Sequence, residues 1–151
     1  MINKIISGGQ TGADRGGLEA ARELGISTGG YCPKGYLTEN GPDLTLKEFG
    51  LIEMETSENN KRTTKNIEIS DATVIIGGTD LDGMLKSRGS IFTFNTAMKL
   101  KKLVLVNPDI KTLKDWLNAQ NFRILNVAGD RESDSPGIQV RTKEYLLKAL
   151  E

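Results

Sequence analysis

The sequence predicts an α/β fold with a central, mostly parallel sheet of about five strands. Short β-branched runs alternate along the chain with segments whose apolar residues recur at helical spacing. Because strands separated by helices pair through right-handed crossovers, the sheet is expected to be parallel. Most of the 17 glycines lie in the first 50 residues. Their concentration there indicates specialised turns rather than a disordered, low-complexity chain.

The first elements are a strand over residues 2–7, where isoleucines lead into two glycines, and a helix over 14–24. Gly25 follows this helix as its expected C-terminal cap. Residues 26–50 lose all periodicity and are predicted as one long loop. Loops of this length are uncommon unless they serve a site. A short strand over 51–54 and a helix over 60–69 come next.

The alternation continues in the second half. Residues 72–76, with the sequence ATVII, form the clearest buried strand, and Ser90 is the expected N-cap of a helix that runs to residue 102. Strands over 103–106 and 123–128 enclose a helix over 112–120. Pro136 begins a final helix that runs nearly to Glu151. No linker or repeat divides the chain, so we expect a single ligand-binding domain over residues 1–151.

Composition restricts the chemistry. Lysines and arginines together number 20, as do aspartates and glutamates, so no overall positive charge favours nucleic acid as a partner. The absence of histidine removes the usual general base and the commonest metal ligand, and we expect no metal held by side chains. No apolar stretch reaches the roughly 18 residues of a membrane span. We therefore expect a cytoplasmic protein with no membrane partner.

The strongest motif, SGGQTGADR, lies between the first strand and the first helix. Glycines let the backbone approach a ligand closely, and a helix N-terminus offers free amides, so the motif predicts a phosphate-binding loop. It fits neither the dinucleotide fingerprint nor the Walker form, since Ser7 takes the place of the first glycine and Gly17 is followed by Leu18. The alternative is a tight turn without a ligand. The candidate binding residues are Gly8, Gly9, Gln10, Thr11, Gly12, Asp14 and Arg15.

Two further clusters follow predicted strands, and the carboxyl ends of parallel strands meet at one edge of a sheet. Alternatives are an ordinary N-capped loop for the first and a solvated ion pair for the second. The candidates after residues 72–76 are Gly78, Thr79, Arg88, Gly89, Ser90 and Thr93, and those after 123–128 are Gly129, Arg131, Glu132 and Ser133. Lys34, in the predicted long loop, is a candidate for closing over an anionic ligand. Cys32 is either an inert packing residue or a contact to a soft metal centre.

The segments SGGQTGADRGGLEAA, TGGYCPKG, RTTKNIEISDATVII and ILNVAGDRESDSPGI resemble the molybdenum cofactor carrier family. That family is a circularly permuted branch of the Rossmann-like superfamily that also contains lysine-decarboxylase-like nucleotide hydrolases. The resemblance implies a three-layer Rossmann-like fold with helices on both faces of the sheet, and a pocket for a phosphorylated, nucleotide-like ligand. It also implies a homo-oligomer, a dimer or a tetramer, and it adds weight to Arg62, Thr63 and Asn66.

Three functions follow from these patterns. The first is a non-catalytic carrier that binds the molybdenum cofactor, a small anionic pterin (molybdopterin). The second is a phosphoribohydrolase-like enzyme that acts on nucleotides or nucleoside monophosphates, with Glu132 or Asp14 as the acid or base. The third is a nucleotide-sensing module without activity. The missing histidine favours binding over catalysis.

Overall fold

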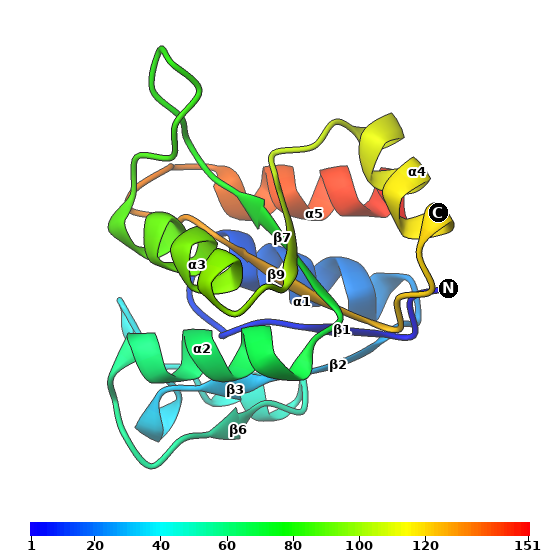
Figure 1. The fold of residues 1–151 in the computed structure, drawn as a ribbon. Coiled ribbons are helices and arrows are strands. Elements are labelled where there is room, and N and C mark those ends of the chain that lie inside the picture. Colours follow the sequence, from blue (N-terminus) through cyan, green and yellow to red (C-terminus); the bar gives the residue numbers. More distant parts are fainter.

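Five parallel strands form the central sheet of the computed structural model, which describes residues 1–151 (Figure 1). Their order across the sheet is β2-β1-β9-β7-β8, and every neighbouring pair is parallel. The strands are β1 (Lys4–Ile6), β2 (Ser27–Gly29), β7 (Ala72–Ile76), β8 (Leu103–Val106) and β9 (Ile124–Gly129). The predicted α/β class is therefore confirmed.

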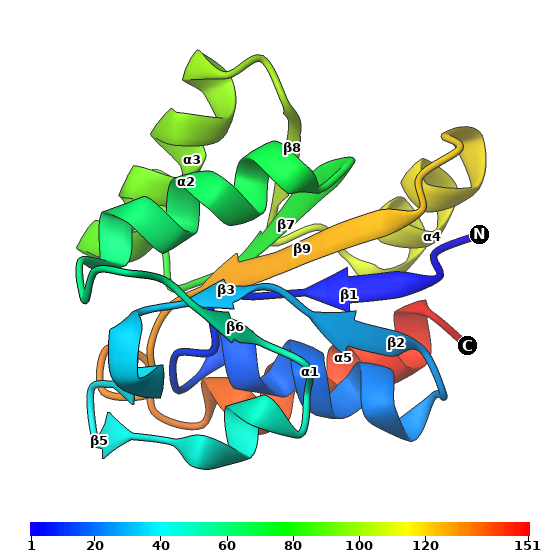
Figure 2. The same cartoon turned by 90° about the horizontal axis from the view of Figure 1, so that it is seen from below.

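Five helices flank the sheet. They are α1 (Ala13–Glu23), α2 (Asn59–Ile69), α3 (Arg88–Lys99), α4 (Ile110–Ala119) and α5 (Ile138–Ala149). Figure 2 shows α2 and α3 on one face of the sheet and α1 and α5 on the other, while α4 packs against α5. The result is the three-layer Rossmann-like arrangement. No helix is both long and apolar enough to span a membrane.

The larger apolar core joins the sheet to α1, α4 and α5. Its buried members include Ile5, Val74, Leu113, Leu125 and Leu146. A second, smaller core lies beneath residues 30–51 and contains Leu18, Cys32, Leu46, Phe49 and Leu51. All of these residues except Leu18 come from the segment after β2, so their packing in this core holds residues 30–51 in one conformation.

The prediction of one long loop over residues 26–50 is wrong. This segment contains β2, the fifth strand of the central sheet, followed by β3 (Tyr31–Cys32), the hairpin of β4 (Leu37–Thr38) and β5 (Gly41–Pro42), and two 3₁₀ helices, Lys34–Tyr36 and Leu44–Lys47. These elements are too short to show periodicity, and long-range contacts hold them. The Asn66 side chain, for example, accepts a hydrogen bond from the Tyr31 N–H and donates one to the Tyr31 carbonyl, both at 2.9 Å.

Other predicted boundaries shift by a few residues. The short strand expected over 51–54 exists as β6 (Ile52–Glu53), but it pairs with β3 outside the central sheet. The N-cap of α3 is Ser87, whose Oγ accepts from the Ser90 N–H, and Ser90 lies inside the first turn. The final helix begins after Gly137, which has a φ of 90°, rather than at Pro136.

The predicted cap at Gly25 is confirmed. Gly25 has a φ of 73°, and its N–H donates to the Arg22 carbonyl. The N–H of Ile26 donates to the Ala21 carbonyl at 2.8 Å, which completes a Schellman motif. This turn directs the chain from α1 straight into β2.

Candidate functional site

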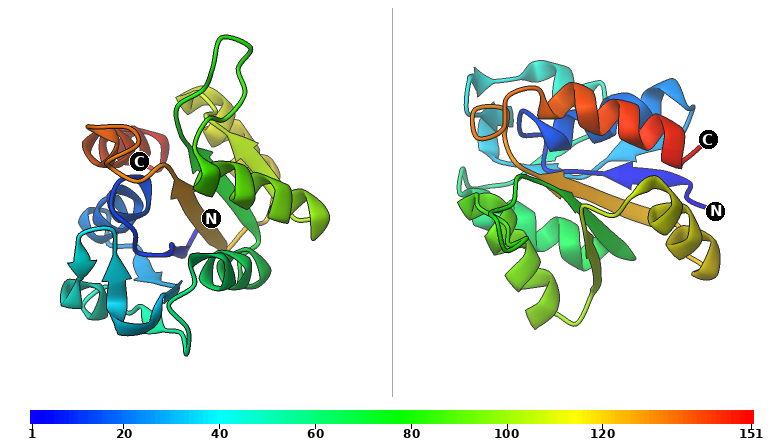
Figure 3. Two further views of the ribbon diagram at one scale, coloured as in Figure 1. Left: turned by 90° about the vertical axis from the view of Figure 1, so that its left-hand side faces the viewer. Right: turned by 90° about the horizontal axis from the view of Figure 1, so that it is seen from above.

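The three predicted clusters meet at the carboxyl edge of the sheet, where the left panel of Figure 3 looks onto the molecule. The Ala13 N–H donates to the Asp130 carbonyl at 3.1 Å, and the Glu132 N–H donates to Thr11 Oγ1 at 3.1 Å. The Gly78 N–H donates to Asp130 Oδ2 at 2.8 Å. The loops that follow β1, β7 and β9 are therefore connected directly to one another.

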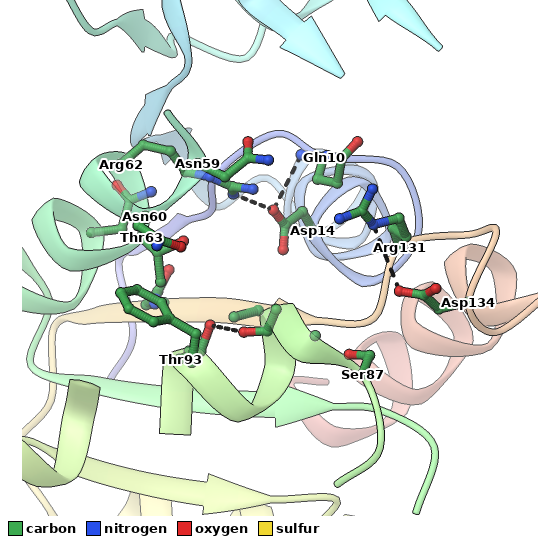
Figure 4. A pocket seen from close by; sticks show the side chains of 17 residues that line it. Gln10, Asp14, Asn59, Asn60, Arg62, Thr63, Ser87, Thr93, Arg131 and Asp134 are labelled. Atoms are coloured by element: carbon green, nitrogen blue, oxygen red, sulfur yellow. Dashed lines mark hydrogen bonds and ion pairs between the residues drawn. The ribbon is translucent and has the colours of Figure 1, made fainter. Parts of the chain in front are cut away.

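A polar pocket of about 70 Å³ opens among these loops (Figure 4). Its wall consists mainly of amide, hydroxyl and charged side chains, and Phe92 and Ala128 are its apolar members. The lining residues are Gly8, Gln10, Asp14, Asn59, Asn60, Arg62, Thr63, Asn66, Ser87, Gly89, Phe92, Thr93, Asn126, Ala128, Gly129, Arg131 and Asp134.

Three helices begin at this pocket. The lining includes Asp14 in the first turn of α1, Asn59 at the start of α2 and Gly89 at the start of α3. Each helix N-terminus carries a partial positive charge from the aligned peptide dipoles. Arg62 and Arg131 also line the pocket, each beside an aspartate that lines it too, Asp14 and Asp134, so any attraction for anions comes mainly from the helix N-termini.

The carboxylate of Asp14 lies within the turn of the glycine loop. Asp14 is 4% exposed, and its Oδ2 accepts from Arg62 Nη1 at 2.9 Å and from the Gln10 N–H at 3.1 Å. Burial raises the pKa of Asp14, against the opposing effect of the Arg62 charge and these hydrogen bonds. An amide that a phosphate-binding loop offers to its ligand is thus bound by a side chain from the first turn of α1.

The loop glycines have packing roles. A Cβ atom on Gly8 would lie 1.4 Å from Arg62 Nη1. Gly9 has a φ of 75°, and a Cβ there would lie 2.8 Å from the methyl carbons of both Leu46 and Leu51. The glycines therefore let the loop approach Arg62 on one side and the second core on the other.

Asp130, which the sequence did not single out as a binding residue, joins the loops after β7 and β9. Its carboxylate accepts from the hydroxyls of Ser87, Ser90 and Ser135 at 2.6, 2.5 and 2.6 Å and from the Gly78 N–H at 2.8 Å. Burial acts to raise the pKa of Asp130, but these donors outweigh it and the pKa is lowered. The Ser90 hydroxyl and the Gly78 N–H, which were expected to bind a ligand, therefore donate to Asp130.

Glu132 and Ser133 are likewise engaged within the protein. Glu132 accepts from the N–H groups of Gly137 and Gln139 at 2.5 and 3.0 Å, so it caps α5 instead of facing the pocket. Glu39, in the β4–β5 hairpin, accepts from the hydroxyls of Ser133 and Thr11. Burial acts to raise the pKa of Glu39, but these hydrogen bonds outweigh burial and the pKa is lowered. The same hydrogen bonds tie the hairpin to the loop after β9.

The expected cations separate in the structure. Arg131 lines the pocket and lies 3.6 Å from Asp134 through Nε. Arg15 pairs with Asp43 at 3.1 Å beside a different hollow, and Lys34 and Arg88 are exposed outside the pocket. Of the remaining candidates, Gly8, Gln10, Gly89, Thr93 and Gly129 line the pocket, whereas Gly12 and Thr79 do not.

Several pocket residues carry a weak sequence signal. Arg62 and Asn66 are buried polar residues four positions apart on α2, yet α2 has the composition of a solvent-exposed helix. Asn126 is a polar residue inside a buried strand, and its Nδ2 donates to Thr73 Oγ1 at 3.2 Å. Polar residues in such apolar or buried positions are the pattern that could have identified them.

Cys32 is a packing residue of the second core. It is fully buried, and burial raises the pKa of its thiol to about 11. The thiolate that would bind a soft metal is therefore scarce near neutral pH. No group of three or more histidine, cysteine, aspartate or glutamate side chains is positioned to hold a metal ion.

Comparisons with known proteins agree with this architecture. Residues 5–150 match the model of the Circularly permutated YpsA SLOG family. The chain is 38% identical to a protein from Syntrophus aciditrophicus SB that carries the provisional name molybdenum carrier protein. The alignment covers 99% of this chain and 96% of that one, with a TM-score of 0.85. None of the curated proteins matches. The fold and the matched sequence together show that the chain belongs to the circularly permutated YpsA SLOG family.

Proposed function

We propose that this protein binds a small phosphorylated ligand in the polar pocket, as a non-catalytic carrier of the molybdenum cofactor. The observation that carries the proposal is the convergence of three helix N-termini with Arg62 and Arg131 on one pocket. Backbone amides and arginines are the groups that hold phosphate in proteins. The choice of the molybdenum cofactor follows the provisional name of the 38% identical relative.

The size of the pocket favours a ligand that enters by its phosphate. The volume of about 70 Å³ is well below the roughly 300–1,000 Å³ of pockets that enclose a whole drug-sized ligand, which favours entry of the phosphate end alone. The ring system then lies toward the rim, where Asn59, Asn60 and Phe92 offer amide groups and an aromatic surface. Amides pair with the edge of a heterocycle, and an aromatic side chain stacks on its face.

The two carboxylates considered for acid or base chemistry, Asp14 and Glu132, favour binding over hydrolysis. A general base needs a lone pair within reach of the proton that it removes. Asp14 is paired with Arg62 and with the Gln10 N–H, and Glu132 caps α5. The two carboxylates considered for acid or base chemistry therefore hold structural positions.

Thermal unfolding in the presence of candidate ligands tests the proposal. Molybdenum cofactor and a panel of nucleoside monophosphates are compared with their dephosphorylated counterparts. A ligand at about 100 times its Kd stabilises the native state by roughly 2.7 kcal/mol, a rise in melting temperature of about 5–10 °C. We expect that rise with the cofactor and none with the dephosphorylated compounds. If no phosphorylated compound raises the melting temperature, the proposal is wrong.

A second assay separates the carrier from the hydrolase. The protein is incubated with each nucleoside monophosphate, and free base is measured by chromatography. A carrier releases no base and returns its ligand intact. Release of base at a rate proportional to protein concentration would support the hydrolase instead.

A further inference from the structure

Strand β8 is an open edge of the central sheet. It pairs with β7 on one side and is the last strand in the order. The Asn107 N–H donates to the Ile75 carbonyl at 2.8 Å, so the backbone groups of Asn107 point toward β7. Because the backbone N–H and C=O groups of successive residues in a strand point to opposite sides, those of Val104 and Val106 point away from β7. Leu103 is 49% exposed on this edge. An uncovered apolar edge strand is a template for pairing with another strand.

A projecting arm, residues 78–86, stands beside the carboxyl end of β8. It is the green loop that extends away from the body in Figures 1 and 3. Thr79 and Leu85 form an antiparallel bridge within it, and Leu81 at its tip is fully exposed. Asn107, the residue after β8, holds the base of the arm through two hydrogen bonds of 2.8 and 2.9 Å with Gly77.

Charge is distributed unevenly along this edge. Residues 83–108 contain no acidic residue. The amino end of β8 follows three lysines, Lys99, Lys101 and Lys102. The carboxyl end has Asp109 after the strand and, in the arm, two aspartates, Asp80 and Asp82, against one lysine, Lys86. The edge therefore has a basic end and an acidic end.

We infer that this edge binds a second copy of the chain, with the two β8 strands antiparallel about a two-fold axis. Antiparallel pairing places the basic end of each strand beside the acidic end of the other, where the arm is attached. A two-fold interface requires a surface that is complementary to itself, and the reversed charges supply that complementarity. The pairing joins two five-stranded sheets into one and covers Leu103 and Leu81. The ligand pocket takes no part in this inference.

Light scattering coupled to size-exclusion chromatography measures the mass of the wild type and of three variants. Val104→Pro removes an outward N–H and leaves the β7 ladder intact, which an edge strand tolerates. Leu81→Lys replaces the exposed leucine of the arm tip with a charge that the lysines at the amino end of the other β8 repel. Val140→Lys is the matched control, since Val140 is 60% exposed on α5. We expect a dimer for the wild type and Val140→Lys, and a monomer for Val104→Pro and Leu81→Lys.

Hydrogen exchange of the wild type keeps the test decisive if Val104→Pro fails to fold. The amides of Val104 and Val106 are expected to exchange slowly at concentrations where the protein is dimeric and rapidly after dilution to monomer. A wild type that is monomeric at every concentration overturns the inference. A dimer in which both amides still exchange rapidly also overturns it, because its interface then lies on another surface.

Discussion

The Asp14–Arg62 pair gives the sharpest prediction of how the glycine loop is stabilised. The two side chains are 6% and 11% exposed and meet at 2.9 Å. Removing one partner of a buried pair leaves an uncompensated charge and costs roughly 3–5 kcal/mol. We therefore expect Arg62→Met to lower the melting temperature by about 10 °C, given the usual 2–4 °C per kcal/mol for chains of this size.

A double-mutant cycle measured by urea unfolding isolates the pair. Asp14→Asn keeps an acceptor for the Gln10 N–H but leaves Arg62 unpaired, so it should also destabilise the protein. The double variant removes both charges, and its loss in free energy of unfolding should fall short of the sum of the single losses by more than about 1 kcal/mol. Lys111→Met is the control, because Lys111 meets Asp115 at 2.7 Å on the open surface and should matter little. Additive losses within about 0.5 kcal/mol would refute the reasoning.

Three further predictions concern neighbouring features. The lowered pKa of Asp130 contributes to the free energy of unfolding above the ordinary value of 3.8, and this contribution is lost as the pH falls through the pKa of the folded protein. Asp130→Asn should therefore make the free energy of unfolding depend less on pH in acid, as urea unfolding between pH 2 and 7 would show. Gly9→Ala should destabilise by about 1–3 kcal/mol, because Gly9 has a φ of 75° and packs on Leu46 and Leu51; unchanged unfolding would contradict this. Cys32 should react with a thiol reagent only in denaturant, and rapid labelling of the native protein would disprove its burial.

The sequence predicted the fold wherever an element is long enough to show a period. Residues 72–76 and 103–106 were assigned their strands without error, and the five helices were placed within a few residues. Strand β2, with the sequence STG, has no β-branched run. It is held by parallel pairing with β1 and by Thr28 Oγ1, which donates to the Phe49 carbonyl at 2.7 Å. Such contacts between distant residues leave no local pattern.

The convergence of the candidate loops was predictable, and their contacts were less so. Glycines and polar residues after three predicted strands placed these loops together at one edge of the sheet, where the structure has them. Which polar groups are available to a ligand depends on carboxylates elsewhere in the chain: Asp130 and Glu39 take up hydroxyl and amide donors from several loops. Arg62 reaches the pocket from a helix of polar composition, 48 positions from its partner Asp14. Only the folded arrangement distinguishes internal pairs from a free anion site.

Binding of the molybdenum cofactor to two arginine variants tests the central claim most directly. Arg131→Gln removes a pocket cation, and Arg123→Gln removes an exposed one immediately before β9, at the opposite edge of the sheet. A hydrogen bond to a charged group contributes about 1.5–3 kcal/mol, so calorimetry should show Kd rising by roughly 10- to 100-fold in Arg131→Gln. Arg123→Gln should bind as the wild type does. Equal affinity in all three proteins would contradict the claim that this pocket holds the ligand by its phosphate.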